Sequence, residues 1–260
     1  MKKIVYSSKT DTGLVRQENE DSLLVNESIG LFIVADGMGG HVGGKKASSM
    51  AVSIIEEYLS ANIEQINLSI ANKPIEKRTI PHLMIKAINN ACSSIFNTGL
   101  TDLALKGMGT TVTSLLIKDN YGFIAHVGDS RCYLMRNDTT IQITDDHSLV
   151  NEQVKTGLIT AEQAKTSRFK NIITRSVGFE DTVAVDTISM EILQGDKLLI
   201  CSDGLSNLVN LDELEHNLTT ESIEQTTETV VDMALERGGD DNITVICLHI
   251  LSCSDEQKDD

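Results

Sequence analysis

The chain has 260 residues, and its 22 lysines and arginines against 38 aspartates and glutamates give a formal net charge of −16 at pH 7. Such an acidic chain lacks the basic face that nucleic acids and anionic membranes attract, so we expect neither as a partner. About 40% of the residues are hydrophobic, which is enough for a sizeable core and argues against a disordered chain.

In chain order, the first predicted elements are a short strand and two amphipathic helices. Residues 31–35 form an apolar run that is typical of a buried strand. Over residues 47–59, apolar side chains recur at spacings of three and four, which predicts a helix with one buried face. The same spacing continues over residues 83–96, and Pro81 suits the first turn of this helix because its missing N–H costs nothing there.

The remainder of the chain is rich in short strands. Branched residues mark five of them, over residues 111–117, 121–127, 131–135, 197–201 and 243–250. Residues 119–120 and 128–130 lie between successive strands as tight turns, so we expect an antiparallel meander there. A third helix is predicted over residues 223–237, ending at two glycines.

The order of these elements indicates the fold class. Strands and helices are clustered and do not alternate strictly, which favours an α+β fold over a doubly wound parallel sheet. The polar stretch at about residues 146–175 lacks a strong period, and we interpret it as a surface insertion with one short helix. We expect one domain over residues 1–250 and a charged tail over residues 251–260.

The five cysteines are scattered, with no C-x-x-C pair and no spacing typical of a metal finger. Cys132, Cys201 and Cys247 lie inside apolar runs and are interpreted as small buried residues. An odd, unpaired set fits a reducing compartment. The basic N-terminus is not followed by an apolar secretory segment, and no run approaches the roughly 20 residues of a membrane span. We therefore expect a soluble, cytoplasmic protein.

Acidic residues recur where apolar strands begin or end. They are Asp36 after residues 31–35, Asp129 before residues 131–135, Asp203 after residues 197–201, and Asp241 before residues 243–250. Carboxylates gathered in one small volume repel one another unless a cation lies between them, and Mg²⁺ and Mn²⁺ prefer oxygen ligands. Because Asp-Gly is also a common hairpin turn, the pattern alone leaves a turn and a metal site as alternatives.

The N-terminal segment adds an arginine and an acidic pair. Arg16 lies four and five residues before Glu20 and Asp21. A guanidinium offers a two-pronged donor for phosphate, and the two acids suit metal-bound waters. The alternative is a solvated acidic loop in which Arg16 is a surface counter-charge.

Eight motifs then occur in a characteristic order. They are Arg16-x-x-Asn19-Glu20-Asp21, Asp36-Gly37-Met38-Gly39-Gly40-His41-x-Gly43-Gly44, Gly109-Thr110-Thr111, Gly128-Asp129-Ser130-Arg131, Asp146-His147-Ser148, Thr174-Arg175-x-x-Gly178, Ser202-Asp203-Gly204 and Asp241-Asn242-x-Thr244. Over residues 5–250 the chain therefore resembles the metal-dependent serine/threonine protein phosphatases of type 2C, in their compact bacterial form. The resemblance implies a four-layer sandwich of two antiparallel β-sheets flanked by α-helices, with a flap insertion.

The resemblance also implies a binuclear centre of two Mn²⁺ or Mg²⁺ ions. Asp36 would bridge the ions through its carboxylate, and the carbonyl of Gly37 would bind one of them. Asp203 and Asp241 would supply the other carboxylates. Two such ions activate a water near neutral pH and neutralise the phosphoryl oxygens for an in-line attack, so no cysteine or serine nucleophile is needed.

Further residues would assist this centre by family resemblance. Glu20 and Asp21 would hold metal-bound waters, and Asp129 with Asp203 would bind a third, weaker ion. The insertion at about residues 146–175 corresponds to the family's mobile flap beside the site.

Substrate binding and protonation of the leaving group would involve other positions. Arg16 would bind the substrate phosphate. Animal members of the family have a histidine after the first Asp-Gly, proposed as the general acid, whereas Met38 stands here and donates no useful proton, as is common in bacterial members. We interpret a metal-bound water as the proton donor to the leaving alkoxide, and His41 as a structural residue of the glycine loop.

The predicted function is hydrolysis of phosphoserine and phosphothreonine in proteins, as a monomer that reverses a bacterial Ser/Thr kinase in signalling. The alternative is a catalytically inactive relative that binds phosphoproteins as a regulatory module. Such proteins usually lose metal carboxylates, whereas Asp36, Asp203 and Asp241 are all present here. A Ca²⁺-stabilised binding domain is weaker still, because the D-x-[DN]-x-[DN]-G loop is missing.

Overall fold

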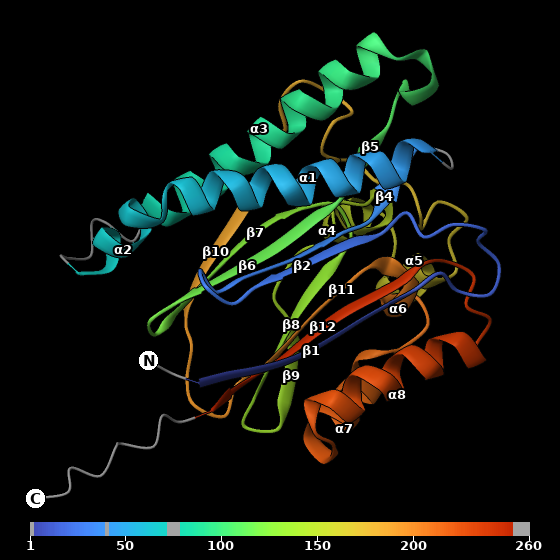
Figure 1. The fold of residues 1–260 in the computed structure, drawn as a ribbon. Helices are drawn as coiled ribbons and strands as arrows, with labels where there is room; N and C mark the ends of the chain where they lie inside the picture. The colour runs from blue at the N-terminus through green and yellow to red at the C-terminus, as the bar shows by residue number, and fades with distance from the viewer. Residues whose placement is uncertain (1–2, 40–41, 72–78, 252–260) are drawn as a thin grey trace, which may run out of the picture.

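The computed structural model describes residues 3–39, 42–71 and 79–251 (Figure 1). His41 and the predicted tail beyond residue 251 lie outside these residues. The described strands form two five-stranded sheets and a two-stranded one, and every strand pair is antiparallel. None of the described helices is both long and apolar enough to cross a membrane.

The first sheet has the strand order β1-β12-β11-β8-β9. Its strands are β1 (Lys3–Asp11), β12 (Ile243–Leu251), β11 (Lys197–Cys201), β8 (Arg131–Arg136) and β9 (Thr139–Gln142). β11 and β12 are buried almost throughout, because the sheet is covered on both faces. β1 pairs with β12 along its whole length, from Lys3 opposite Leu251 to Asp11 opposite Ile243.

The second sheet has the strand order β10-β7-β6-β3-β2. Its strands are β10 (Asp186–Glu191), β7 (Tyr121–Val127), β6 (Val112–Lys118), β3 (Leu31–Ala35) and β2 (Ser22–Asn26). The predicted hairpin at residues 119–120 is confirmed between β6 and β7, and Asp119 has φ 51° there. The two-stranded sheet pairs β4 (Gly37–Met38) with β5 (Gly109–Thr110).

The predicted meander is wrong at residues 128–130. β7 and β8 belong to different sheets, so this segment carries the chain from one sheet to the other. Gly128 has φ 113°, and a Cβ on it would lie 2.5 Å from the Thr111 side chain, so only glycine fits the crossing. A turn signal marks a change of direction but does not identify the partner strand, and β8 pairs with β11, where Cys132 lies opposite Ile200.

Helices cover the outer face of each sheet, which completes the four layers seen in Figure 1. One outer layer comprises α1 (Val42–Ala61), α2 (Ile63–Ala71) and α3 (Thr79–Thr101), followed by the short 3₁₀ helix η2 (Leu103–Leu105). The other comprises α6 (Asp203–Ser206), α7 (Leu211–Thr220) and α8 (Ile223–Glu236). The predicted helices over 47–59, 83–96 and 223–237 are confirmed within α1, α3 and α8, and the predicted fold class is confirmed.

The insertion between β9 and β10 contains two short helices where one was predicted. They are α4 (Leu149–Lys155) and α5 (Ala161–Lys165). Each begins at a hydroxyl side chain, Ser148 or Thr160, that accepts a hydrogen bond from the first turn. We call residues 146–175 the flap segment.

Three apolar clusters separate the four layers. One lies between α1, α3 and the second sheet, one between the two sheets, and one between the first sheet and α7 and α8. Cys132, Cys201 and Cys247 belong to these clusters and are free and buried, as predicted. Burial raises the pKa of Cys132 and of Cys247 to about 12, so neither thiol ionises near neutral pH.

Candidate metal centre

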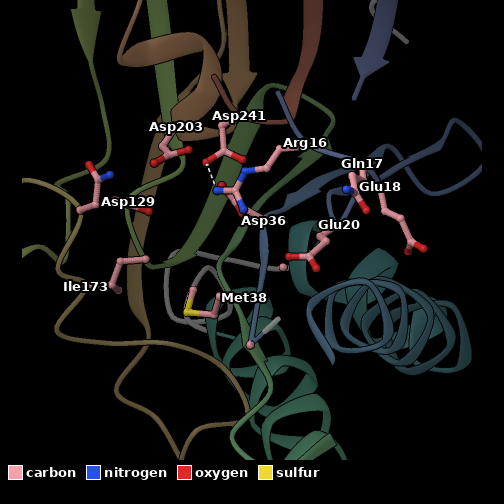
Figure 2. Close-up of a pocket in the computed structure, with 13 residues that line it drawn as sticks. Arg16, Gln17, Glu18, Glu20, Asp36, Met38, Asp129, Ile173, Asp203 and Asp241 are labelled. Atoms are coloured by element: carbon pink, nitrogen blue, oxygen red, sulfur yellow. Dashed lines mark hydrogen bonds and ion pairs between the residues drawn. The ribbon is translucent and has the colours of Figure 1, made fainter. Parts of the chain in front are cut away.

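The four acidic strand ends meet at one end of the β-sandwich (Figure 2). Asp36 directly follows β3 in one sheet, whereas Asp203 follows β11 in the other. Asp241 precedes β12, and Asp129 lies in the crossing between the sheets. All four line one cavity of about 320 Å³, and the same lining includes Arg16, Glu20, Gly37 and Met38.

The glycines that follow two of these aspartates allow close backbone packing. A Cβ on Gly37 would lie 2.3 Å from the carbonyl oxygen of Gly44 and 2.5 Å from that of Glu20. A Cβ on Gly204 would lie 2.1 Å from the carbonyl oxygen of Asn242. Asp36-Gly37 leads into β4 and Asp203-Gly204 begins α6, so the alternative of simple hairpin turns is wrong for both pairs.

The Gly-Thr-Thr motif fixes the backbone of Asp36. The Asp36 N–H donates to Thr111 Oγ1 at 2.9 Å, and its carbonyl accepts from Thr110 Oγ1 and from the Thr111 N–H, both at 2.8 Å. Three hydrogen bonds to one residue hold its side chain in a defined place in the cavity.

Asn242 has a positioning role that the sequence analysis did not assign. Its Oδ1 accepts from the Glu20 N–H at 2.8 Å, and its Nδ2 donates to the carbonyls of Thr12 and Glu18 at 2.9 and 3.0 Å. One side chain thus fastens the N-terminal loop to the end of β12. Its place in the eighth motif was the only sequence signal.

Asp21 lies behind the cavity and does not line it, unlike the other predicted residues. Its Oδ2 accepts from Ser202 Oγ at 2.8 Å, and Ser202 Oγ also accepts from the Thr244 N–H at 3.0 Å. Burial raises the pKa of Asp21 to about 7, and the neighbouring charges of Asp203 and Asp241 add to this increase. A carboxyl buried at this depth needs a proton or a cation near it.

The other carboxyls are perturbed in the same direction. Burial, followed by the charges of Asp21 and Asp203, raises the pKa of Asp36 well above its usual range. Burial and the charge of Asp203 raise the pKa of Asp129 to about 7. Burial, followed by the charge of Asp241, also raises the pKa of Asp203.

Three buried carboxylate oxygens indicate what the cavity can bind. The Oδ1 atoms of Asp21, Asp129 and Asp203 have no hydrogen-bond partner among the described residues. Burying such an acceptor without a partner is costly, and a hard divalent cation satisfies several at once. The donor set therefore fits Mg²⁺ or Mn²⁺.

The carboxylates do not already form a closed cage. Over residues 3–39, 42–71 and 79–251, no group of three or more His, Cys, Asp or Glu side chains is arranged so that it could hold a metal ion by itself. Mg²⁺ ordinarily binds through one or two carboxylates and keeps several waters, so a sparse and open arrangement of acids is compatible with such an ion.

Arg16 faces the carboxylates from the N-terminal loop, 225 positions before Asp241 in the sequence. Its Nη2 donates to Asp241 Oδ2 at 2.6 Å, and both side chains are partly exposed. The hydrogen bond to Asp241, and to a smaller extent the charges of Glu20 and Asp36, raise the pKa of Arg16. A phosphate accepts from the same guanidinium fork as a carboxylate, so Arg16 stands where it can exchange one for the other.

The described lining of the cavity contains no histidine, cysteine or serine. Met38 lies at its edge (Figure 2) and pairs through its backbone with Gly109. The cavity thus offers carboxylates and a cationic arginine, without a side-chain nucleophile in the described part. This arrangement suits attack by water on an anionic substrate.

Comparisons with known proteins agree with this geometry. The sequence model of the protein phosphatase 2C family matches residues 8–241. A serine/threonine phosphatase of Listeria innocua is 38% identical over 242 residues, 92% of each chain. The Streptococcus agalactiae serine/threonine phosphatase structure has a TM-score of 0.83 at 34% identity, covering 95% of this chain and 100% of that one. The catalytic domain of the phosphatase PstP, solved with two manganese ions, has a TM-score of 0.80 at 30% identity, covering 96% and 99%.

Proposed function

Because this chain belongs to the protein phosphatase 2C family, it is a serine/threonine protein phosphatase, and we propose that Asp36, Asp203 and Asp241 hold its divalent metal ions. The observation that carries this proposal is the set of buried carboxylate oxygens without hydrogen-bond partners, Oδ1 of Asp203 among them, where the two sheets meet. Nothing supports the inactive alternative, since every carboxylate of the predicted centre is present.

Two divalent ions, when bound, supply a hydroxide nucleophile near neutral pH and neutralise the phosphoryl oxygens. The protein's own residues then act by placement. The Gly-Thr-Thr motif holds Asp36, while Ser202 and Asn242 hold the acidic loop. Arg16 exchanges Asp241 for the substrate phosphate and orients it. Because the transition state of phosphoryl transfer is loose, such positioning and electrostatic stabilisation dominate catalysis.

The leaving alkoxide needs a proton that Met38 cannot supply. The described lining has no histidine to replace it, so this proton comes from water in the cavity. The carbonyl of Gly37 would bind one of the ions, and Glu20 and Asp21 would hold waters beside them. These assignments rest on their places in or directly behind the cavity.

We propose Mn²⁺ or Mg²⁺ as the two tightly bound ions and a third, weaker ion at Asp129 with Asp203. A calorimetric Mn²⁺ titration is expected to give two tight sites and one weaker site in the wild type. Asp129→Asn should remove the weak site alone, because it removes a carboxylate whose Oδ1 has no partner in the described structure. Loss of the tight sites in this variant would contradict the assignment, as would the absence of any Mn²⁺ binding to the wild type.

We also propose that the phosphatase acts as a monomer in the bacterial cytoplasm, where it reverses a Ser/Thr kinase. When the phosphatase is incubated with autophosphorylated Ser/Thr kinases from the same genome, phosphothreonine should be removed from them. Immunoblotting against phosphothreonine, with and without Mn²⁺, measures this loss. Release of phosphate from phosphotyrosine peptides alone would contradict the substrate class.

A further inference from the structure

A second cavity, of about 560 Å³, adjoins the metal centre, and Asp129 and Asp203 line both. Its walls come from the flap segment, with α4 and α5, and from residues 206–211 after α6. We call this cavity the flap groove. Its volume lies in the range of cavities that hold ligands, and it shares two lining residues with the metal centre.

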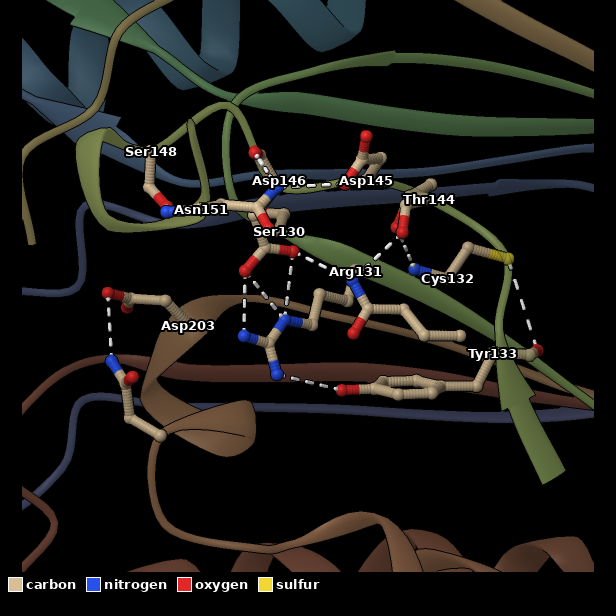
Figure 3. Close-up of polar contacts among 12 residues, drawn as sticks. Ser130, Arg131, Cys132, Tyr133, Thr144, Asp145, Asp146, Ser148, Asn151 and Asp203 are labelled. Atoms are coloured by element: carbon tan, nitrogen blue, oxygen red, sulfur yellow. Dashed lines mark hydrogen bonds and ion pairs between the residues drawn. The ribbon is translucent and has the colours of Figure 1, made fainter. Parts of the chain in front are cut away.

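The floor of the flap groove is electrically balanced. Arg131 donates to both carboxylate oxygens of Asp146, at 2.7 to 3.0 Å, and to the hydroxyl of Tyr133 at 3.3 Å (Figure 3). A bidentate pair of this kind is already satisfied. Asp129 and Asp203 also line the groove, but they belong to the proposed metal centre. The remaining charge of the groove lies on its rim.

The flap segment is basic within an acidic chain. Residues 155–175 carry five basic side chains and one acidic one, Glu162, although the chain as a whole has a net charge of −16; the basic residues are Lys155, Lys165, Arg168, Lys170 and Arg175. Lys155 pairs with Asp145, and Arg175 pairs with Asp186. Lys165, Arg168 and Lys170 are the basic side chains of this segment that these two ion pairs leave over.

Two lysines of the flap segment line the groove itself. Lys170 has no ion-pair partner in the part of the chain that the structure describes. Lys165 pairs only with Glu162, and both side chains are more than 70% exposed, so the pair contributes little. Both ammonium groups are thus available to an anionic ligand.

The chain runs from the groove into the metal centre within four residues. Lys170 lines the groove, whereas Asn171 and Ile173 line the metal centre. A peptide with its phosphorylated residue in the centre therefore places neighbouring residues beside Lys170. Val150 and Val154 of α4 add apolar wall to the same groove, against which an extended peptide can pack.

We propose that the flap groove binds the residues next to the phosphorylated serine or threonine and selects acidic ones through Lys165 and Lys170. The proposal rests on the proposed function, since the phosphate must lie in the adjoining centre. Away from the flap, an acidic chain repels an acidic substrate. A local cationic rim beside the centre is the feature that reverses this repulsion.

The test compares two phosphothreonine peptides that differ only in flanking residues, glutamates in one and lysines in the other. With Mn²⁺, the wild type is expected to show about a five-fold higher kcat/KM for the glutamate peptide, mostly through KM, because surface ion pairs remote from the reacting bond act on binding. Lys165→Glu combined with Lys170→Glu should abolish or invert this ratio. Added salt should reduce it in the wild type.

The matched control is Lys86→Glu combined with Lys118→Glu, which changes the net charge equally at positions on α3 and β6 that line neither cavity. It should keep the wild-type ratio. Any one of three results would overturn the proposal. The wild type could show equal kcat/KM for the two peptides, or the flap variant could keep the wild-type ratio of kcat/KM for the glutamate and lysine peptides. The third result is a control variant that loses this ratio as much as the flap variant does. Absence of Mn²⁺-dependent phosphate release from both peptides and from p-nitrophenyl phosphate would instead contradict the proposed function.

Discussion

Replacing Asp36 by asparagine is expected to lower Mn²⁺-dependent hydrolysis of p-nitrophenyl phosphate by about 10³-fold or more. The amide removes a carboxylate charge from the cavity, while three backbone hydrogen bonds keep the residue in place. Asp203→Asn should have an effect of similar size, because its unpartnered Oδ1 belongs to the same cavity. Initial rates against Mn²⁺ concentration provide the measurement.

Two control variants separate this effect from misfolding and from substrate binding. Asp212→Asn changes an exposed carboxylate on α7 and should leave the rate unchanged. Arg16→Ala should chiefly raise KM for phosphopeptides, roughly ten-fold, because a charge-assisted contact to phosphate is lost while the carboxylates remain. Circular dichroism must show native spectra for all variants. Wild-type activity in both Asp36→Asn and Asp203→Asn would refute the assignment.

The sequence predicted those elements in which burial imposes a strong pattern. Residues 31–35 are apolar throughout, and residues 243–250 are mostly apolar, because helices or a second sheet cover both faces of their sheets. β10 and β1 were missed because they alternate between partly buried and exposed residues and are rich in Ser, Thr and charged side chains. These strands are specified by their partners, β7 and β12, more than by their own composition.

The crossing at residues 128–130 marks another limit of local reasoning. Its turn residues were identified correctly, but which strand receives β8 depends on apolar contacts with β11 that are distant in sequence. The pairing of Arg16 with Asp241 and the three hydrogen bonds of Asn242 likewise join residues more than 200 positions apart. No local spacing encodes them, whereas aspartates at strand ends are visible in any window of ten residues.

Without divalent metal, the free energy of unfolding is expected to fall as the pH rises from 6.5 to 8, by roughly 2 kcal/mol. The pKa values of Asp21 and Asp129 are raised to about 7 in the folded protein, and that of Asp36 is raised well above its usual range. In the unfolded chain these carboxyls ionise near pH 4. The folded state therefore binds more protons in this range, and stability is lost as they dissociate.

The range begins at pH 6.5 because His126 has the opposite effect at lower pH. Burial lowers the pKa of His126 to about 4, and its ring stacks against His147 at 4.7 Å. Because unfolded histidine titrates near 6.5, the unfolded state binds more protons between pH 4 and 6.5, and His126 makes the protein more stable as the pH rises there. Between pH 6.5 and 8 the unfolded histidine releases only about half a proton, a change of roughly 0.4 kcal/mol. The carboxyls therefore determine most of the slope.

Mn²⁺ should reverse this dependence of the free energy of unfolding on pH. The reversal distinguishes a metal centre from a buried cluster of neutral acids. A cation competes with protons for the same oxygens, so the stabilisation by Mn²⁺ is expected to increase between pH 6.5 and 8. Urea unfolding with EDTA and with Mn²⁺ measures both curves, and histidine contributions cancel in their difference. Asp129→Asn should make the metal-free curve less steep, because Asp21 and Asp36 remain. A metal-free stability that stays constant over this range would mean that the carboxylates are already ionised, and an Mn²⁺ effect independent of pH would mean that the ion binds elsewhere.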